Sequence, residues 1–258
     1  MAKTTHSNYA DELQDQIRSW NRKPGLRFVY EQWYAQIVAS LSPLRPVVEI
    51  GSGCGNFKRY FPETVATDVI HTGEWIDQLV DARQLPFAEN SVGNFVLIDC
   101  LHHLPRPLEF LRQAARALRP GGRIVMLEPA ITPWSRLVWK FCHHEPVVLT
   151  QDFFAEDGLP EPDNPGFAYA NMGTAHLLFT RNRDKLLQAV PGVKLQKLTL
   201  SDALIYPLTG GFSYWSLLPA DMIKRLYPLE RACVSPIARL TALRMLIVLE
   251  RDSDTRPG

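Results

Sequence analysis

The sequence lacks the features that mark several broad classes of protein. Its 28 Lys and Arg residues against 27 Asp and Glu residues leave a formal net charge of +1, so no overall field attracts a nucleic acid. Its longest apolar runs, such as Val47–Ile50 and Leu246–Leu249, are far shorter than the roughly 20 residues that span a bilayer. The polar first twenty residues lack the apolar core of a signal peptide. These absences predict a soluble, cytoplasmic protein without a nucleic-acid partner or a transmembrane segment.

Cysteine is scarce, and its four positions are widely separated. The absence of any C-x-x-C pair favours free thiols in a reducing compartment. The segment Cys142–Glu145 reads Cys-His-His-Glu and looks like a metal cluster at first sight. However, consecutive residues of a regular element cannot all point at one ion, and no second set of ligands has metal spacing. The sequence therefore predicts no metal site.

The chain of 258 residues is long enough for one large α/β domain with an elaboration. Apolar residues at helical spacing predict two helices within an N-terminal segment, residues 1–45. In residues 46–258, short β-branched runs and amphipathic helices predict a largely parallel sheet with helices on both faces. Helices are expected at 9–20, 26–41, 56–61, 108–118 and 183–189, and strands at 47–50, 64–69, 76–80, 95–98, 123–127, 193–200 and 244–250.

Two segments, about 130–180 and 203–243, break this regular alternation with aromatic residues, prolines and polar loops. We interpret them as insertions that build a cap over the active edge of the sheet. Three aromatic residues of the second segment, Tyr206, Tyr214 and Trp215, are expected to bind substrate, because apolar acceptors bind in aromatic-lined pockets. Packing within the cap, or contact with a membrane surface, is the alternative for these rings.

A glycine-rich loop follows the first predicted strand, with glycines at positions 51, 53 and 55. Glycine permits a positive φ and a close approach of the backbone to a ligand, and the following helix offers N–H groups to an anion. A dinucleotide site requires its third glycine at position 56, where the chain has Asn56. The acidic Glu49 before the first glycine is also foreign to that pattern.

The form E-x-G-x-G-x-G resembles motif I of class I S-adenosylmethionine (SAM)-dependent methyltransferases. Further segments continue the resemblance in the expected order: a strand that ends at Asp68, Asp81–Phe87 with Leu-Pro-Phe, the loop Asp99–Leu104, and Leu118–Ile124 with Leu-Arg-Pro-Gly-Gly. Together these segments cover about residues 46–129. The most similar subgroup is methyltransferase type 11, which includes many quinone, sterol and natural-product enzymes.

The resemblance implies a Rossmann-like class I methyltransferase fold with a mostly parallel seven-stranded sheet. It also implies SAM as the methyl donor and S-adenosylhomocysteine as the product. In this family the glycine loop holds the methionine end, Asp68 holds the ribose, Asp81 and Ala82 hold the adenine, and Asp99 borders the methyl group. The expected cofactor-binding residues are Glu49, Gly51, Ser52, Gly53, Gly55, Asn56, Asp68, Asp81, Ala82 and Asp99.

The sequence departs from the family pattern after the second strand. Only the six residues Ile70–Trp75 separate the second and third predicted strands, whereas a parallel crossover normally needs about a dozen or more residues. The usual helix is therefore expected to be missing or shortened. Trp75 or Ile70 is then expected to take over the packing against adenine.

Three residues are candidates for catalysis: His102, His103 and Glu128. Methyl transfer requires alignment of two reactants and, for some acceptors, removal of one proton, and histidine titrates in a suitable range. The alternative for a histidine is a cap on the following helix. Glu128 lies at the end of a strand, where it could orient an acceptor hydroxyl or amine, and the alternative is a surface carboxylate.

The expected function is SAM-dependent methyl transfer to a small-molecule or lipid-like acceptor, with peripheral membrane contact left open. A SAM-binding regulator without chemistry is the alternative. A nucleic-acid methyltransferase is disfavoured, because the residues after the fourth strand, Asp99–His102, do not form the Asn/Asp-Pro-Pro-aromatic signature. The sequence gives neither the acceptor nor the oligomeric state.

Overall fold

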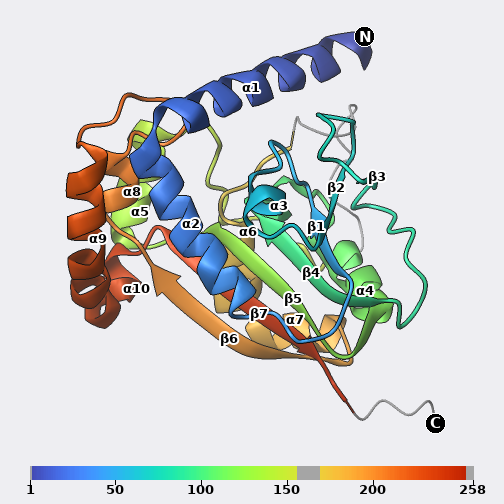
Figure 1. The fold of residues 1–258 in the computed structure, drawn as a ribbon. Helices are drawn as coiled ribbons and strands as arrows, with labels where there is room; N and C mark the ends of the chain where they lie inside the picture. The colour runs from blue at the N-terminus through green and yellow to red at the C-terminus, as the bar shows by residue number, and fades with distance from the viewer. Residues whose placement is uncertain (1, 156–168, 254–258) are drawn as a thin grey trace.

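The computed structural model describes residues 2–155 and 169–253, which form one seven-stranded sheet with helices on both faces (Figure 1). The strand order is β3-β2-β1-β4-β5-β7-β6, and β7 runs antiparallel to both of its neighbours. The predicted mostly parallel sheet is therefore confirmed. The strands are β1 (Val47–Ile50), β2 (Thr64–Asp68), β3 (Gln78–Leu79), β4 (Val92–Ile98), β5 (Leu118–Pro129), β6 (Val193–Ser201) and β7 (Arg244–Arg251).

The helices are distributed along the whole described chain. They are α1 (Ala2–Arg22), α2 (Pro24–Val38), α3 (Asn56–Tyr60), α4 (Pro107–Ala117), α5 (Pro133–Cys142), α6 (Thr174–His176), α7 (Arg183–Ala189), α8 (Ile205–Leu208), α9 (Ala220–Val234) and α10 (Ala238–Thr241). Single 3₁₀ turns, η1 (Leu101–His103) and η3 (Ser235–Ile237), and a π-helical turn, η2 (Leu177–Arg181), complete the set.

Alternate residues of the central strand β5 enter two different hydrophobic cores, because side chains of a strand alternate between the faces of its sheet. Ile124 and Met126 pack in the core that α4, α6 and α7 cover. Val125 and Leu127 pack in the core that α2 and α9 cover. Both faces of the sheet are therefore buried, as a parallel sheet requires.

The N-terminal helices form part of this layered structure. Leu26, Val29 and Ile37 of α2 are fully buried in the same core as strand residues of β1, β4 and β5. Figure 1 shows α1 running across the top of the molecule and α2 descending along the sheet. Of the predicted cap insertion at 130–180, residues 156–168 lie outside the described residues; its described part forms α5, α6 and η2, and residues 203–243 form α8 to α10.

The connection between β2 and β3 contains no helix, which confirms the shortened crossover that the sequence predicted. The third strand lies where it was expected but comprises only Gln78–Leu79, paired in parallel with β2. By contrast, the fifteen-residue helix α9 was not anticipated. Its internal Pro228 is a residue that normally argues against a helix, because proline has no N–H to donate.

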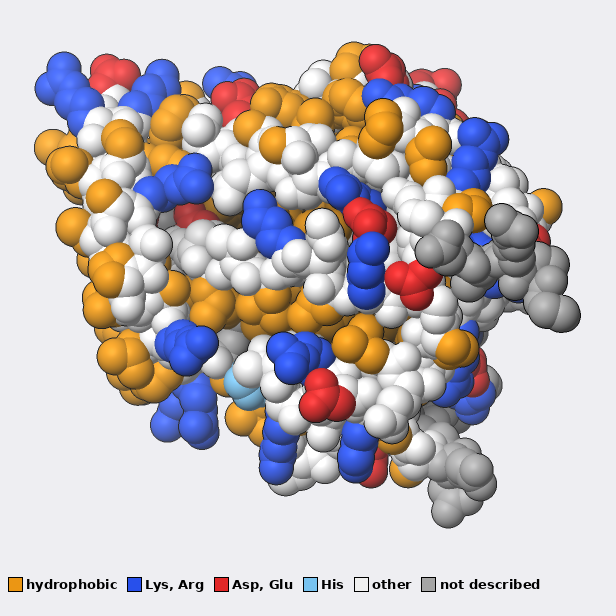
Figure 2. Space-filling model, turned by 90° about the horizontal axis from the view of Figure 1, so that it is seen from below, with side chains coloured by type: hydrophobic (Ala, Val, Ile, Leu, Met, Phe, Trp, Pro, Cys, Tyr) orange, Lys and Arg blue, Asp and Glu red, His pale blue; other side chains and the backbone are white. Residues whose placement is uncertain are grey.

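The surface in Figure 2 carries Lys and Arg side chains interspersed with Asp and Glu, without an expanse of one sign on this face. Hydrophobic side chains gather at the side of the molecule where α9 and α10 lie (Figures 1 and 2). Exposed residues there include Leu229 and Leu240. Within the described residues, none of the helices has the length and apolarity needed to cross a membrane.

Asn94 of β4 ties the segment before β1 to the sheet. Its fully buried side chain accepts the N–H of Ser42 at 2.8 Å and donates to the carbonyls of Ser42 at 3.1 Å and Leu44 at 2.8 Å. Asn94→Ala leaves these buried backbone groups unpaired, so we expect a loss of about 3 kcal/mol in the free energy of unfolding. Denaturant titration measures the loss.

The control is Asn21→Ala, at an exposed position of α1, which should change the free energy of unfolding by no more than about 0.5 kcal/mol. Equal stability of the two variants would contradict the role given to Asn94.

Candidate functional site

A cavity of about 860 Å³ opens at the carboxyl edge of the sheet. The parallel strands β1, β2 and β4 end there, and ligands bind at this edge in open α/β sheets. Side chains from α1, α2, α5 and the segment before α9 complete the wall. Among them are Leu13, Tyr34, Trp139, Phe141 and Phe212.

The glycine loop after β1 forms one wall of this cavity. Gly51 has a φ of 72°, and a Cβ atom there would lie 2.8 Å from the sulfur of Cys100. Asp68 at the end of β2 holds the loop, because one carboxylate oxygen accepts the N–H of Gly53 at 2.8 Å and the other accepts the N–H of Val69 at 2.8 Å. Each oxygen can accept a further hydrogen bond, so Asp68 retains acceptor capacity toward the cavity.

Trp75 contacts the glycine loop and does not line the cavity. Its indole Nε1 donates to the carbonyl oxygen of Gly53 at 2.9 Å, and the hydroxyl of Thr72 donates to the same oxygen at 2.8 Å. A Cβ atom at Gly55 would lie 2.4 Å from the indole ring. Neither Trp75 nor Ile70 lines the cavity, so the structure does not support the predicted packing of either side chain against adenine.

Asp81 and Ala82 follow β3 and line the cavity. The carboxylate of Asp81 accepts hydrogen bonds from Nε and Nη2 of Arg83 at 3.0 and 2.7 Å. It also accepts the backbone N–H of Arg83 at 2.8 Å. These contacts lower the pKa of Asp81, against a smaller opposing effect of burial. The carboxylate is thus held in one orientation by its neighbour.

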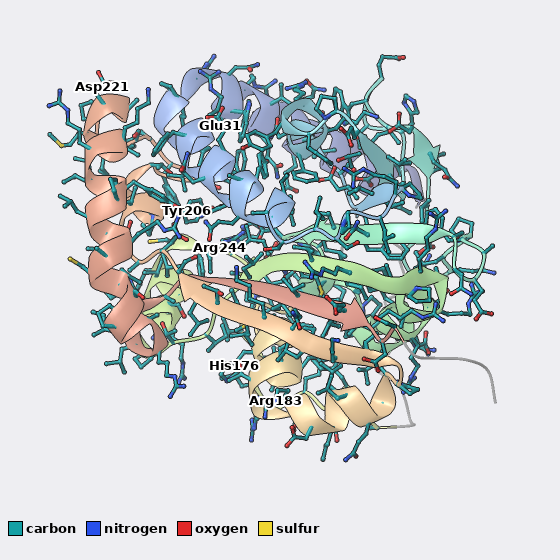
Figure 3. The ribbon with its side chains drawn as sticks, turned by 60° about the horizontal axis from the view of Figure 1, so that its bottom comes forward. Glu31, His176, Arg183, Tyr206, Asp221 and Arg244 are labelled. Atoms are coloured by element: carbon teal, nitrogen blue, oxygen red, sulfur yellow. The ribbon has the colours of Figure 1, made fainter. Side chains whose placement is uncertain are left out.

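Asp99, a half-buried residue at the end of β4, forms an ion pair with the buried Arg244 at the start of β7. The two side chains meet at 2.6 Å, and the Arg244 guanidinium lies 4.6 Å from the centre of the Trp33 ring and 5.9 Å from that of Tyr206 (Figure 3). Burial opposes the charge, but Asp99 outweighs it and raises the pKa of Arg244. A cation between two aromatic faces is favourable when it is desolvated.

Glu128 is fully buried at the end of β5, and it orients the loop that carries the two histidines. One carboxylate oxygen accepts the N–H groups of Cys100 at 3.0 Å and Leu101 at 2.7 Å, and the other lies 2.6 Å from Nδ1 of His102. Glu128 does not line the cavity and its oxygens are occupied, so the structure does not support a direct contact with an acceptor, and its full burial excludes the alternative of a surface carboxylate. Its contacts fix the orientation of the His102 ring.

His102 and His103 lie in η1 and line the cavity, rather than capping α4. Glu145, which follows α5, faces both rings: its carboxylate oxygens lie 3.3 Å from Nε2 of His102 and 3.6 Å from Nε2 of His103. Burial disfavours the charged form of His102, but Glu128 and Glu145 outweigh it and raise its pKa to about 10. Burial and the neighbouring His102 lower the pKa of His103.

Four polar atoms of cavity-lining residues have no hydrogen-bond partner among the described residues: Oε2 of Glu49, Oδ1 of Asn56, Oε2 of Glu145 and Nε of Arg244. Glu49 is 3% exposed, and its burial raises the pKa of its carboxyl to about 7. Buried polar atoms are usually hydrogen-bonded, so an unpaired atom beside a cavity indicates a place for a ligand.

The cavity brings together nearly all of the residues predicted from the sequence. All the predicted cofactor-binding residues except Gly55 line it, as do His102 and His103. The three predicted acceptor residues also line it: Tyr206 is half-buried, whereas Tyr214 and Trp215 are 55% and 74% exposed.

Sequence reasoning missed Arg244, Glu145 and the aromatic residues of α2 as parts of the site. A charged residue directly before the apolar run Met245–Leu249 was the available signal for Arg244. Glu145 lies in the Cys-His-His-Glu segment, and the histidine loop that it faces is distant in the sequence. Tyr30 and Tyr34 repeat at helical spacing, which indicates burial but not burial against a cavity.

Comparison with known proteins gives matches to methyltransferases. Residues 48–126 match the methyltransferase domain family. The 27-O-demethylrifamycin SV methyltransferase of Amycolatopsis mediterranei is 31% identical over 121 residues, which cover 37% of this chain and 44% of that protein. The ubiquinone/menaquinone biosynthesis C-methyltransferase UbiE of Roseobacter denitrificans is 44% identical over 48 residues, 19% of each chain. The match thus spans less than half the length of each of these relatives.

Solved structures share the fold at low sequence identity. A SAM-dependent methyltransferase from Archaeoglobus fulgidus aligns with a TM-score of 0.51 and 12% identity, covering 87% of this chain and 94% of that one. A SAM-dependent methyltransferase from Thermotoga maritima gives the same TM-score at 13% identity, covering 93% and 99%. Together with the match over residues 48–126, this agreement confirms the resemblance found in the sequence. Residues 48–126 are therefore similar to the methyltransferase domain family, and the chain has the Rossmann-like fold of class I methyltransferases.

Proposed function

We propose that this protein transfers the methyl group of SAM to a small-molecule or lipid-like acceptor. The proposal rests on one observation: the glycine loop, Asp68, Asp81 and the histidine loop all line the same cavity. The family match and the fold support the same conclusion.

The residues of the cavity fit SAM by their chemistry. The unpaired carboxylate oxygen of Glu49 and the loop at 51–55 suit the charged methionine end, since carboxylates accept charge-assisted hydrogen bonds from an ammonium group. Asp68 has acceptor capacity for ribose hydroxyls, and Asp81 with Ala82 would adjoin the adenine. When bound, SAM supplies an activated methyl group on a sulfonium, so the protein mainly has to align the two reactants.

The acceptor side of the cavity is aromatic. Tyr30, Tyr206 and Phe212 line it, and Tyr214 and Trp215 stand exposed at its rim. Such a lining suits an apolar molecule with a few polar groups, and a cavity of about 860 Å³ lies within the range of small-molecule sites. The related rifamycin enzyme is named for a natural-product substrate, and the UbiE relative for quinone biosynthesis.

The proposal is tested by titrating SAM and S-adenosylhomocysteine into the protein in a calorimeter. Both ligands should bind to the wild type, and Asp68→Ala should weaken binding at least about 30-fold, because two charge-assisted hydrogen bonds are lost. Asp68→Asn keeps one acceptor oxygen for the glycine loop and separates ligand binding from loop structure. Asp184→Ala, an exposed position on α7, is the matched control and should bind as the wild type does.

No binding of either ligand to the folded wild type would refute the proposal. Binding without turnover of any small acceptor would instead favour a SAM-dependent regulator.

A second test uses the raised pKa of Glu49. Its carboxyl, with a pKa of about 7, is mostly protonated at pH 5.5 and half ionised at pH 7. Because only the ionised form attracts the ammonium group of the ligand, the affinity for S-adenosylhomocysteine should rise about tenfold between pH 5.5 and pH 7. Glu49→Gln should bind weakly and without this rise. An identical pH dependence in wild type and Glu49→Gln would show that Glu49 is not the group that titrates.

A further inference from the structure

Two short segments that are far apart in the sequence bring three potential metal ligands together. One ligand atom each of His102, His103 and Glu145 lie within 4.8 Å of one another, and both Nε2 atoms face the Glu145 carboxylate, at 3.3 and 3.6 Å. The ligands of a four-coordinate zinc ion lie about 3.4 Å apart, as follows from metal–ligand bonds of about 2.1 Å. Small side-chain shifts are therefore enough to close the three groups around one ion.

The hydrogen bonds of the two rings leave acceptor atoms pointing at the centre of this cluster. Nδ1 of His102 lies 2.6 Å from the carboxylate of Glu128, and Nδ1 of His103 lies 3.2 Å from the carbonyl oxygen of Tyr169. Both partners can only accept, so each Nδ1 is the donor. In its neutral form each ring carries an Nε2 lone pair toward Glu145, and His102, whose pKa is raised to about 10, reaches that form when a metal ion displaces its Nε2 proton.

The carboxylate of Glu145 adds further acceptor atoms to the same point. Its Oε2 atom is inaccessible to solvent and accepts no hydrogen bond from the described residues, although Nε2 of His102 is 3.3 Å away. Two imidazoles and a carboxylate oxygen that face one another need a positive charge between them. A proton on Nε2 of His102 supplies that charge when no ion is bound, and a metal ion would take the place of this proton.

The outer contacts are those of metal-bound histidines. A histidine that binds a metal usually donates its other N–H to a carboxylate or a backbone carbonyl, which fixes the tautomer and the ring orientation. His102 has the first kind of partner and His103 has the second. Glu128 itself is fixed by the N–H groups of Cys100 and Leu101.

We propose that His102, His103 and Glu145 form a binding site for a divalent transition-metal ion at the edge of the cavity. Two imidazoles and one carboxylate suit Zn²⁺, Fe²⁺ or Mn²⁺, whereas Mg²⁺ and Ca²⁺ prefer oxygen ligands alone. Three protein ligands leave a position open, and all three residues line the cavity, so that position faces bound small molecules. If the proposed methyl transfer is correct, the open position adjoins the acceptor.

His143 is the nearest further imidazole, but it is not counted as a ligand. Its Nδ1 accepts the N–H of Glu145 at 3.3 Å and lies 3.9 Å from the carboxylate of that residue. His144 is exposed and has no part in the cluster. The sequence prediction of no metal site considered Cys142–Glu145 alone, whereas the fold supplies the two histidines of η1 as the missing ligands.

The test is the metal content of the purified protein after treatment with a chelator, titration with Zn²⁺ and gel filtration. The wild type should retain one zinc ion per chain and should retain no Mg²⁺ under the same conditions. His103→Ala and Glu145→Ala should each retain less than a tenth of an equivalent. Glu128→Gln, which disturbs only the outer contact of His102, should weaken zinc affinity by about 10- to 100-fold.

His144→Ala is the matched control, since it removes a neighbouring histidine that is not a ligand, and it should retain one equivalent. Circular dichroism and thermal unfolding establish that each variant is folded. A folded wild type that retains no zinc would overturn the proposal, as would equal retention by Glu145→Ala. The readout is the metal itself, so it decides the question even if SAM binding fails, and it separates a metal site from a cluster held together by protons.

Discussion

Four parallel strands, β1, β2, β4 and β5, end at one edge of the sheet, and the site depends on this shared edge. The strand ends place Gly51, Asp68, Asp99 and Glu128 around the same region, although 77 residues separate the first from the last along the chain. Each of the three carboxylates is anchored by N–H groups or by a buried cation. Because backbone hydrogen bonds fix the strand register, these side chains are positioned before any ligand arrives.

The second constraint is that a buried charged group needs partners. Arg244 contacts Asp99 and two aromatic rings, and Glu128 forms hydrogen bonds with two N–H groups and one imidazole. Removing one partner of such a pair leaves the other charge uncompensated in a low dielectric. Glu49 lacks this compensation among the described residues, which agrees with its raised pKa and with a role in holding a charged ligand.

The cavity wall combines residues at the sheet edge with residues from segments outside the match to the methyltransferase domain family. The glycine loop and Asp68 come from residues 48–126, which match the methyltransferase domain family. Tyr206, Trp215 and Glu145 come from outside that match, on the side of the cavity proposed for the acceptor and the metal ion. The proposed function therefore places the cofactor and the acceptor against different parts of the chain.

The sequence by itself determined the sheet-forming segments and the cofactor wall, because both depend on local signals. β1, β2, β4, α4 and α7 lie close to their predicted positions, and the glycine loop needs only neighbouring residues to be recognised. Local patterns did not predict α9, because its internal Pro228 argues against a helix, although tertiary packing stabilises one there. Only the tertiary structure decided three contacts of the site. Glu128 forms a hydrogen bond with His102, Arg244 pairs with Asp99, and Glu145 faces both histidines. These contacts join residues 26 to 145 positions apart, and a sequence pattern carries no distance information across such separations.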